Sequence, residues 1–228
     1  LAAGRGERMR PLTDTTPKPL LQVRGLPLMG WHMNALRASG HTRLLANTAW
    51  LGEQIEAAFG PALTYSHEGR DFGGALETAG GIARALPRLD EVFWLVAGDV
   101  FVPGFRFDAA ARARFAASDA LAHLWLVPNP AHHPRGDFGL AGDGRAVDGD
   151  GPDGLRHTYS TIALLKHGLF EPPLCDLPAG NPQGIKAPLA PLLRRGMDNG
   201  RVSAELYTGP WTDVGTPERL AQLNREMP

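Results

Sequence analysis

A short segment at the start of the chain combines two glycines with two arginines, a pattern suited to binding phosphate. Gly4 and Gly6 stand one residue apart, directly after the apolar residues 1–3, and Arg8 and Arg10 follow them. Glycines let the backbone approach a ligand closely, the N–H groups of such a turn attract oxyanions, and guanidinium groups suit phosphate. The segment lacks the third glycine of a dinucleotide fingerprint and the Gly-Lys-Ser/Thr of a P-loop. Taken alone, the two glycines are equally typical of a solvated surface turn.

A single lysine follows on a stiff stretch of backbone. Lys18 lies between Pro17 and Pro19. Because each proline fixes its own φ, the lysine side chain is held with a defined direction. Lys18 is therefore a further candidate for neutralising phosphate charge.

Two aspartates occupy positions where a hard cation could be bound. Asp99 follows the apolar stretch Val92–Val96, and Asp213 lies within Trp211–Thr216. Ligands of open α/β sheets bind at the carboxyl ends of strands, where Asp99 is expected, and Mg²⁺ prefers one or two carboxylates together with substrate oxygens. An aspartate after a strand also occurs as a turn residue or helix cap, which is the alternative for each position alone.

Two consecutive glycines open a predicted helix in the segment Glu77–Gly81. Inside a helix each glycine costs about 1 kcal/mol relative to alanine. Close approach of the backbone to a flat ligand would justify both glycines. Loose packing of the helix on a sheet is the alternative.

These segments together resemble the signature of the sugar-1-phosphate nucleotidyltransferases. The resemblance is carried by residues 1–13, residues 17–20, the pair Gly98-Asp99 and the late segment Trp211–Thr216. It implies a Mg²⁺-dependent in-line attack of a sugar phosphate on the α-phosphorus of a nucleoside triphosphate, with release of pyrophosphate. It also implies catalytic roles for four charged residues: Arg8 and Lys18 on the triphosphate, Asp99 and Asp213 on the metal. The nucleotide-binding residues implied by the resemblance are Leu1, Ala2, Ala3, Gly4, Gly6, Glu7, Arg8, Lys18, Thr78, Gly80, Gly81 and Gly98.

Within this family, the segments Asn47–Gly52, Glu77–Gly81 and Pro128–Phe138 look like those of the N-acetylmuramate-1-phosphate uridylyltransferases of peptidoglycan recycling. This implies UTP and N-acetylmuramate-1-phosphate as substrates. Ala97 departs from the pattern, because relatives often carry Asn before Gly-Asp. Mannose-1-phosphate guanylyltransferase and glucose-1-phosphate thymidylyltransferase activities remain alternatives. An inactive nucleotide-sugar sensor is a remote one, since neither metal aspartate, nor Arg8 or Lys18, is lost.

The sugar side has weaker candidates. Asp137 is expected to contact a sugar hydroxyl, and Ser160 and Thr161 are weaker candidates for such a contact. Lys186 is a candidate for binding the sugar phosphate, although a solvated lysine at the start of a helix is an equally good interpretation. The adjacent His132 and His133 do not predict a zinc site, because neighbouring side chains point in different directions and no third ligand is evident.

The composition argues against several classes of binding partner. With 23 Lys and Arg against 24 Asp and Glu the formal charge is −1, so no basic footprint for nucleic acid is present. No apolar run approaches the roughly 18 residues of a membrane span, and the single Cys175 allows no internal disulfide. We expect a cytoplasmic protein, monomeric or homodimeric, that does not bind membranes. The chain begins at Leu1 rather than Met and runs directly into the glycine segment, so we expect that a few further residues, forming the body of a first strand, precede it.

Strand and helix patterns alternate along most of the chain, which favours an α/β fold. Beyond about residue 128 short Gly-, Pro- and Asp-rich segments favour antiparallel pairing. We expect a single-domain, three-layer α/β/α sandwich of the Rossmann-like nucleotidyltransferase type, with a mixed, mainly parallel sheet. Its nucleotide-binding half is expected over 1–127 and its sugar-binding half over 128–228. The clearest predicted elements are strands at 44–46, 63–66, 92–96, 121–127, 138–140 and 158–165, and helices at 29–36, 51–59, 78–86, 108–118, 186–197 and from 216.

Overall fold

A computed structural model describes residues 1–225 and shows an α/β protein that divides into two compact units. The first unit contains Leu1–Glu77, Ala97–Phe107 and the segment from Pro210 on. The second contains Thr78–Val96 and Asp108–Gly209. Each unit draws on both sides of residue 127, so neither coincides with a predicted half. That the whole chain acts as a single domain stays a prediction.

The first unit holds short strands and the helices that follow them. Its strands are β1 (Gln22–Val23), β2 (Leu26–Pro27), β3 (Leu45–Thr48), β4 (Thr64–His67), β6 (Val100–Phe101) and β12 (Thr212–Asp213). Its helices are α1 (Leu12–Thr15), α2 (Leu28–Ala38), α3 (Gly52–Phe59), α4 (Glu68–Phe72) and α8 (Pro217–Arg225), with 3₁₀ turns η1 (Glu7–Met9), η2 (Lys18–Leu20) and η3 (Gly60–Ala62).

Parallel pairing in this unit brings the start of the chain beside β3. β3 and β4 pair in parallel, and Ala2 forms a parallel bridge with Thr48 at the end of β3. The apolar face of α2 covers this region, because Met29 and Met33, four residues apart, cluster with Ala2 and with Ile55 of α3. The glycine segment thus follows closely on Ala2, which is buried beside the end of β3.

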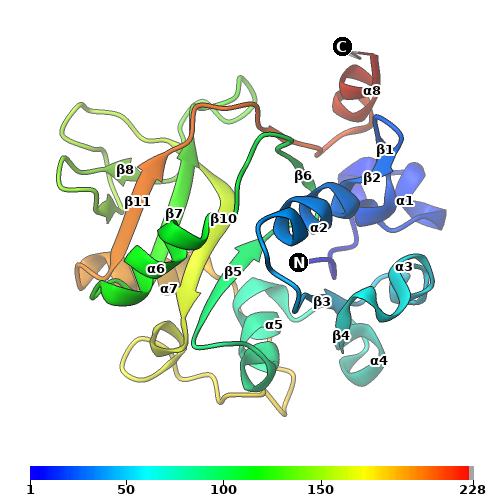
Figure 1. The fold of residues 1–228 in the computed structure, drawn as a ribbon, viewed down its shortest axis with the longest axis horizontal. Coiled ribbons are helices and arrows are strands. Elements are labelled where there is room, and N and C mark those ends of the chain that lie inside the picture. The colour runs from blue at the N-terminus through cyan, green and yellow to red at the C-terminus, as the bar shows by residue number, and fades with distance from the viewer. Residues whose placement is uncertain (226–228) are drawn as a thin grey trace. The chain divides into compact units, whose positions relative to one another are not determined.

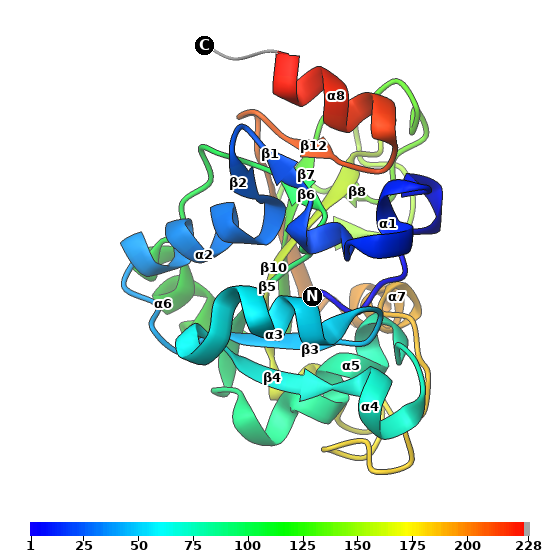
Figure 2. The ribbon, with the colours of Figure 1, turned by 90° about the vertical axis from the view of Figure 1, so that its right-hand side faces the viewer.

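The second unit is built around a four-stranded sheet. Its strands are β5 (Val92–Val96), β7 (Ala122–Val127), β10 (Thr158–Lys166) and β11 (Val202–Leu206), with a side hairpin of β8 (Gly139–Leu140) and β9 (Ala146–Val147). Its helices are α5 (Glu77–Ala85, beginning at the last residue of the first unit), α6 (Ala109–Ala117) and α7 (Ala190–Asp198), with 3₁₀ turns η4 (Leu86–Arg88) and η5 (His167–Phe170). α6 covers one face of the sheet and α7 the other, which gives this unit three layers (Figures 1 and 2).

The sheet is mixed, as predicted, but its pairing is less parallel than expected. The strand order is β11-β7-β10-β5. β11 is parallel to β7, whereas β10 is antiparallel to both β7 and β5. Three of the four strands therefore run in one direction, while two of the three neighbouring pairs are antiparallel. The reason is that β10 is inserted between β5 and β7.

Local signals account for several of these elements. β5 is entirely apolar, and α6 begins after Asp108, whose Oδ1 accepts a hydrogen bond from the Ala110 N–H at 3.0 Å. α7 begins at Ala190, later than the predicted residue 186, with Pro191 in its first turn, where proline is tolerated. No helix within residues 1–225 is both long enough and apolar enough to cross a bilayer.

Candidate functional site

A short antiparallel ladder brings the two predicted metal aspartates together in the first unit. Asp213 of β12 is paired with Val100 of β6, and the Val214 N–H donates to the Asp99 carbonyl at 2.9 Å. The two aspartates are thus fixed on neighbouring backbone positions, although they are far apart in the sequence. Their carboxylates supply the hard oxygen donors that Mg²⁺ prefers. Residues 1–225 hold no cluster of three or more His, Cys, Asp or Glu that could by itself bind a metal ion.

A cation accompanies each aspartate. Lys18 Nζ lies 2.8 Å from Asp99 Oδ2, and the lysine is buried. Arg219 of α8 donates from Nη1 to the Asp213 carbonyl at 3.0 Å and forms an ion pair with Asp213 Oδ2. Gly215 leaves space for this ion pair, because a Cβ there would lie 3.0 Å from Arg219 Nη2 and 3.1 Å from Asp213 Oδ2. The two carboxylates and two cations balance in charge.

A buried histidine supports the ladder from α2. His32 Nε2 lies 2.8 Å from the Val100 carbonyl. Burial lowers the pKa of His32 to about 4, so its ring is neutral near pH 7 and donates through Nε2–H. Neither His32 nor Arg219 was predicted from the sequence, because neither belongs to a recognisable motif.

The glycine segment is held against Gly98 and against Lys18. The Gly98 N–H donates to the Leu1 carbonyl at 2.8 Å, and a Cβ on Gly98 would lie only 2.7 Å from that oxygen. Gly6 has φ +68°, and a Cβ there would lie 3.3 Å from Lys18 Cβ. Both glycines are therefore needed for close approach of the chain to itself. Gly4 and Glu7 are exposed, whereas Ala2 and Ala3 are buried.

The arginines of the segment differ in their partners. Arg5 donates to the Thr13 carbonyl at 2.7 Å and to Asp14 Oδ1 at 3.0 Å, and its guanidinium lies 3.7 Å from the ring centroid of Trp50. Arg10 also pairs with Asp14. Arg8 is exposed and makes no hydrogen bond or ion pair with any residue from 1 to 225. Of the loop arginines, Arg8 is thus the one available to an incoming phosphate.

In the second unit, the start of α5 is joined to the loop that carries Lys186. The Ala187 carbonyl accepts hydrogen bonds from the N–H groups of Ala79 at 2.9 Å and Gly80 at 3.1 Å, while Asn181 donates to the Gly80 carbonyl at 3.1 Å. Both backbone groups of Gly80 are therefore engaged within the protein. Gly81 is buried, Thr78 is partly exposed and Lys186 is exposed. Backbone recognition of a base by these residues stays a prediction.

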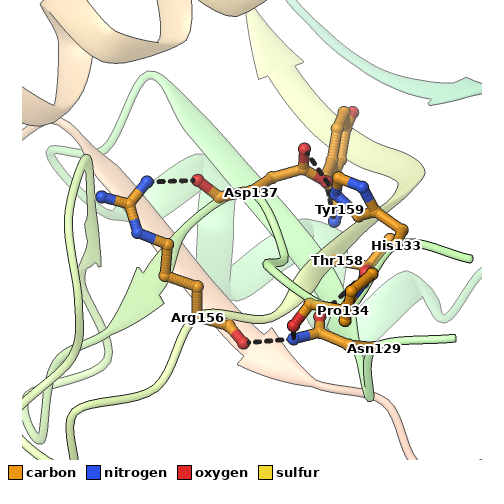
Figure 3. Close-up of polar contacts among 7 residues, drawn as sticks. All are labelled: Asn129, His133, Pro134, Asp137, Arg156, Thr158 and Tyr159. Carbon is orange, nitrogen blue, oxygen red and sulfur yellow. Dashed lines mark hydrogen bonds and ion pairs between the residues drawn. The ribbon is translucent and has the colours of Figure 1, made fainter. Parts of the chain in front are cut away.

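Asp137 is engaged by the start of β10 (Figure 3). Its Oδ2 accepts the Tyr159 N–H at 2.8 Å, and its Oδ1 lies 3.2 Å from His133 Nε2. Arg156 donates to the Asp137 carbonyl at 3.4 Å. The carboxylate thus positions the backbone at Tyr159, and its predicted contact with a sugar hydroxyl stays a prediction.

The turn before Asp137 is braced by Asn129 (Figure 3). The Asn129 amide donates to the carbonyls of Pro134 at 3.2 Å and Arg156 at 2.9 Å, and its Oδ1 accepts from Thr158 Oγ1 at 2.9 Å. Gly136 has φ +63°, and a Cβ there would lie 2.8 Å from both Asn129 Oδ1 and the Arg156 carbonyl carbon. The turn is therefore closely held to the strand beside it.

The other two sugar-side candidates lie in a bulge of β10. The pairing of β10 with β7 shifts register between Tyr159 and Ala163. Ser160 is wholly buried, and its Oγ accepts the Ile162 N–H at 3.2 Å. Thr161 has φ +65°, and its Oγ1 is buried with no hydrogen-bond partner among residues 1–225. A β-branched residue in the left-handed region is a strained exception, and such exceptions gather at functional sites.

Comparison with known proteins decides the family. Residues 1–138 match the MobA-like NTP transferase domain. The chain belongs to this family. It is 47% identical over 231 residues to the N-acetylmuramate alpha-1-phosphate uridylyltransferase of Neisseria meningitidis serogroup B, covering 97% of this chain and 94% of the relative. It is 30% identical to the enzyme of the same name from Caulobacter vibrioides, covering 96% and 91%.

Solved structures agree in fold with this MobA-like NTP transferase domain. A Bacillus anthracis protein provisionally named a glucose-1-phosphate thymidylyltransferase superposes with a TM-score of 0.76 at 18% identity, covering 100% of this chain and 94% of that one. The inositol-1-phosphate CTP transferase from T. maritima gives 0.68 at 18% identity, covering 100% and 95%. The predicted nucleotidyltransferase family and its α/β fold are confirmed. The roles of individual residues stay predictions.

Proposed function

We propose that this nucleotidyltransferase moves a uridylyl group from UTP to N-acetylmuramate α-1-phosphate, forming UDP-N-acetylmuramate and pyrophosphate. The observation that carries the proposal is the 47% identity to the Neisseria meningitidis uridylyltransferase over nearly the full length of both chains. The family membership supports the reaction class independently of the sugar.

In the proposed reaction an oxygen of the sugar phosphate forms a new bond to the α-phosphorus, and the bond from that phosphorus to the pyrophosphate oxygen breaks. No redox step and no covalent enzyme intermediate are needed, so positioning and charge neutralisation provide the catalysis. Arg8 is exposed and has no hydrogen-bond or ion-pair partner among residues 1–225, and Asp99 holds Lys18 beside the ladder. We assign both cations to the triphosphate.

Magnesium is part of the proposal because of the charge balance around the ladder. Lys18 and Arg219 neutralise Asp99 and Asp213, so these four side chains bring no excess positive charge to a polyanionic triphosphate. Two carboxylates on adjacent backbone positions fit a hard divalent cation that also takes phosphate oxygens. Bound Mg²⁺ would supply Lewis-acid neutralisation of the charge that develops on the phosphates.

Relatives with other substrates define the alternatives. The glucose-1-phosphate thymidylyltransferase of Streptomyces griseus is 29% identical over 99% of this chain and 64% of its own length. The mannose-1-phosphate guanylyltransferase of Mycobacterium tuberculosis is 34% identical, but over only 44% of this chain. Both are more distant than the uridylyltransferase from Neisseria meningitidis.

A substrate panel tests the proposal. UTP, dTTP and GTP are each combined with N-acetylmuramate-, glucose- and mannose-1-phosphate, with and without Mg²⁺, and pyrophosphate release is measured. We expect turnover with UTP and N-acetylmuramate α-1-phosphate that stops when the metal is chelated. Preferred turnover of GTP with mannose-1-phosphate, or of dTTP with glucose-1-phosphate, would overturn the substrate assignment.

Two substitutions test the metal ligands. Asp99→Asn and Asp213→Asn should each abolish Mg²⁺-dependent turnover while the circular dichroism spectrum stays that of the folded protein. Asp176→Asn is the matched control, because Asp176 is exposed and lies outside the ladder. Near wild-type rates in either ladder variant would show that the metal site is misplaced.

A further inference from the structure

A fully buried carboxylate lies at the start of α4 in the first unit. Glu68, the first residue of α4, is 0% exposed. Its Oε2 accepts the Leu76 N–H at 2.7 Å, and its Oε1 accepts from Asn47 Nδ2 at 2.8 Å. A buried carboxylate is tolerated only when donors such as these replace water. Glu68 therefore depends on this arrangement of its neighbours, and they depend on it.

Asn47 extends the contact to the glycine segment. The Asn47 side chain is buried in β3, and its Oδ1 accepts the Ala2 N–H at 2.8 Å. The result is a continuous path from the Ala2 N–H through Asn47 and Glu68 to the Leu76 N–H. Ala2 lies within the residues 1–4 assigned to the nucleotide, and Leu76 stands two positions before Thr78 in the sequence.

The backbone around Glu68 leaves no room for adjustment. Gly69 follows Glu68, and a Cβ there would lie 2.7 Å from the Ala49 Cα and 2.7 Å from its carbonyl oxygen. Ala49 itself follows the end of β3. The start of α4 thus packs directly against the chain that leaves β3, two residues after Asn47.

We propose that Glu68 and Asn47 are positioning residues that fix the Ala2 and Leu76 backbones for nucleotide binding. The proposal rests on the proposed function, because it takes the residue 1–4 segment and Thr78 as nucleotide contacts. Neither side chain touches the substrate in this scheme. Each acts through the backbone N–H group that it holds. The expected consequence of breaking the pair is weaker binding of the nucleoside triphosphate, with the sugar-phosphate KM unchanged.

The chemistry of the pair allows an exchange test. In Glu68→Gln, the oxygen of the introduced amide accepts the Leu76 N–H. The NH2 group of that amide then faces the NH2 group of Asn47, so two donors face each other. In Asn47→Asp, two carboxylates face each other. In the double variant, the carboxylate at position 47 accepts two hydrogen bonds, one from the Ala2 N–H and one from the NH2 group of the amide at position 68. The oxygen of that amide accepts the third, from the Leu76 N–H. The three hydrogen bonds and the single negative charge are then restored with their positions exchanged.

The experiment measures the UTP Kd by calorimetry without sugar phosphate, the KM of each substrate, and the melting temperature, for the two single variants and the double. Each single variant should raise the UTP Kd and KM on the order of tenfold, and the double should recover most of that loss. Glu53→Gln, on the exposed side of α3, is the matched control.

Unchanged UTP affinity in both folded single variants, or losses that simply add in the double, would overturn the proposal. So would equal increases in the KM of both substrates, since these indicate a general structural role. If the single variants fail to fold, the double decides the matter: a folded double that binds UTP weakly contradicts the proposal. Wild-type protein that binds UTP but does not turn over with any sugar phosphate would contradict the proposed function and leave the binding test of Glu68 and Asn47 valid.

Discussion

Replacing Thr161 with glycine should stabilise the protein and weaken its use of the sugar phosphate. Thr161 has φ +65° in the bulge of β10, and its buried Oγ1 has no hydrogen-bond partner among residues 1–225. Glycine adopts this backbone region without a steric penalty and removes the buried hydroxyl. The native threonine is thus a poor choice for stability alone.

The magnitude follows from four opposing terms. Left-handed backbone costs an L-residue about 1–2 kcal/mol, and an unsatisfied buried hydroxyl costs about 1–3 kcal/mol. Against these, glycine loses about 0.5–1 kcal/mol more chain entropy on folding, and the loss of two carbons, Cβ and Cγ2, removes about 1.6 kcal/mol of burial. We expect a net stabilisation of about 1 kcal/mol, which for a chain of this length raises Tm by roughly 2–4 °C.

The assay is urea unfolding together with thermal melting of Thr161→Gly, Thr161→Ala and wild type. The alanine variant removes the hydroxyl but keeps Cβ in the left-handed region, so it should gain less than the glycine variant. A glycine variant no more stable than wild type would refute the reasoning from backbone strain. Kinetics on the same proteins test the proposed sugar contact, since both variants should raise the KM for the sugar phosphate and leave that for UTP unchanged.

The remaining predictions concern the first unit. The folded pKa of His32 is about 4, below the ordinary value of 6.5, so the unfolded state binds more protons and the free energy of unfolding falls by about 3 kcal/mol as the pH drops from 6.5 to 4. In urea titrations at pH 7 and pH 4.5, His32→Gln should lose less of this free energy on acidification than wild type does. Equal losses in the two proteins would contradict this. Trp50→Phe keeps an aromatic ring against the Arg5 guanidinium but loses the hydrogen bond from the indole N–H to the Thr13 carbonyl, whereas Trp50→Ala loses both. We therefore expect the UTP KM to rise about tenfold in the alanine variant and less in the phenylalanine variant. Asp99→Asn should destabilise the protein about 1–3 kcal/mol more than Lys18→Met, because it leaves the buried ammonium without its anion; melting curves with and without UTP check this, and a larger loss in Lys18→Met would contradict it.

Elements with a strong local signal were predictable, and very short ones were not. The all-apolar β5 and the Asp108-capped α6 lie where the sequence places them, to within a residue. The two-residue strands β6 and β12 carry no periodicity, and they pair only because the chain returns after more than a hundred residues. The insertion of β10 between β5 and β7 is likewise a property of the whole sheet. Pattern analysis therefore found the residues of the ladder without predicting the ladder.

In the candidate site, too, the residue types were predictable from the sequence and the contacts between them were not. The residue types of Lys18 and Asp99 indicated phosphate and metal chemistry, but nothing in the sequence indicated that they form an ion pair. Glu68 resembles any acid in the first turn of a helix, and its burial depends on hydrogen bonds from Asn47 and from Leu76. Motifs identify residues that contact ligands, whereas residues that hold the backbone in place are found only from the fold.

Lys18 and Asp99 share one ion pair but have different surroundings, and the difference bears on how the proposed site would be filled. The Lys18 side chain is 10% exposed and that of Asp99 is 42% exposed. Because an unpaired buried ammonium is costly, Lys18 needs an anion in every state, while the Asp99 carboxylate can be hydrated. The lysine can therefore exchange its carboxylate partner for a phosphate oxygen without losing charge compensation, and that exchange leaves the Asp99 oxygen open to a cation. Binding of the polyanion and of the cation then favour each other, and this coupling is reciprocal by thermodynamic necessity. The ion pair would thus help the two ligands bind together and disfavour either one alone.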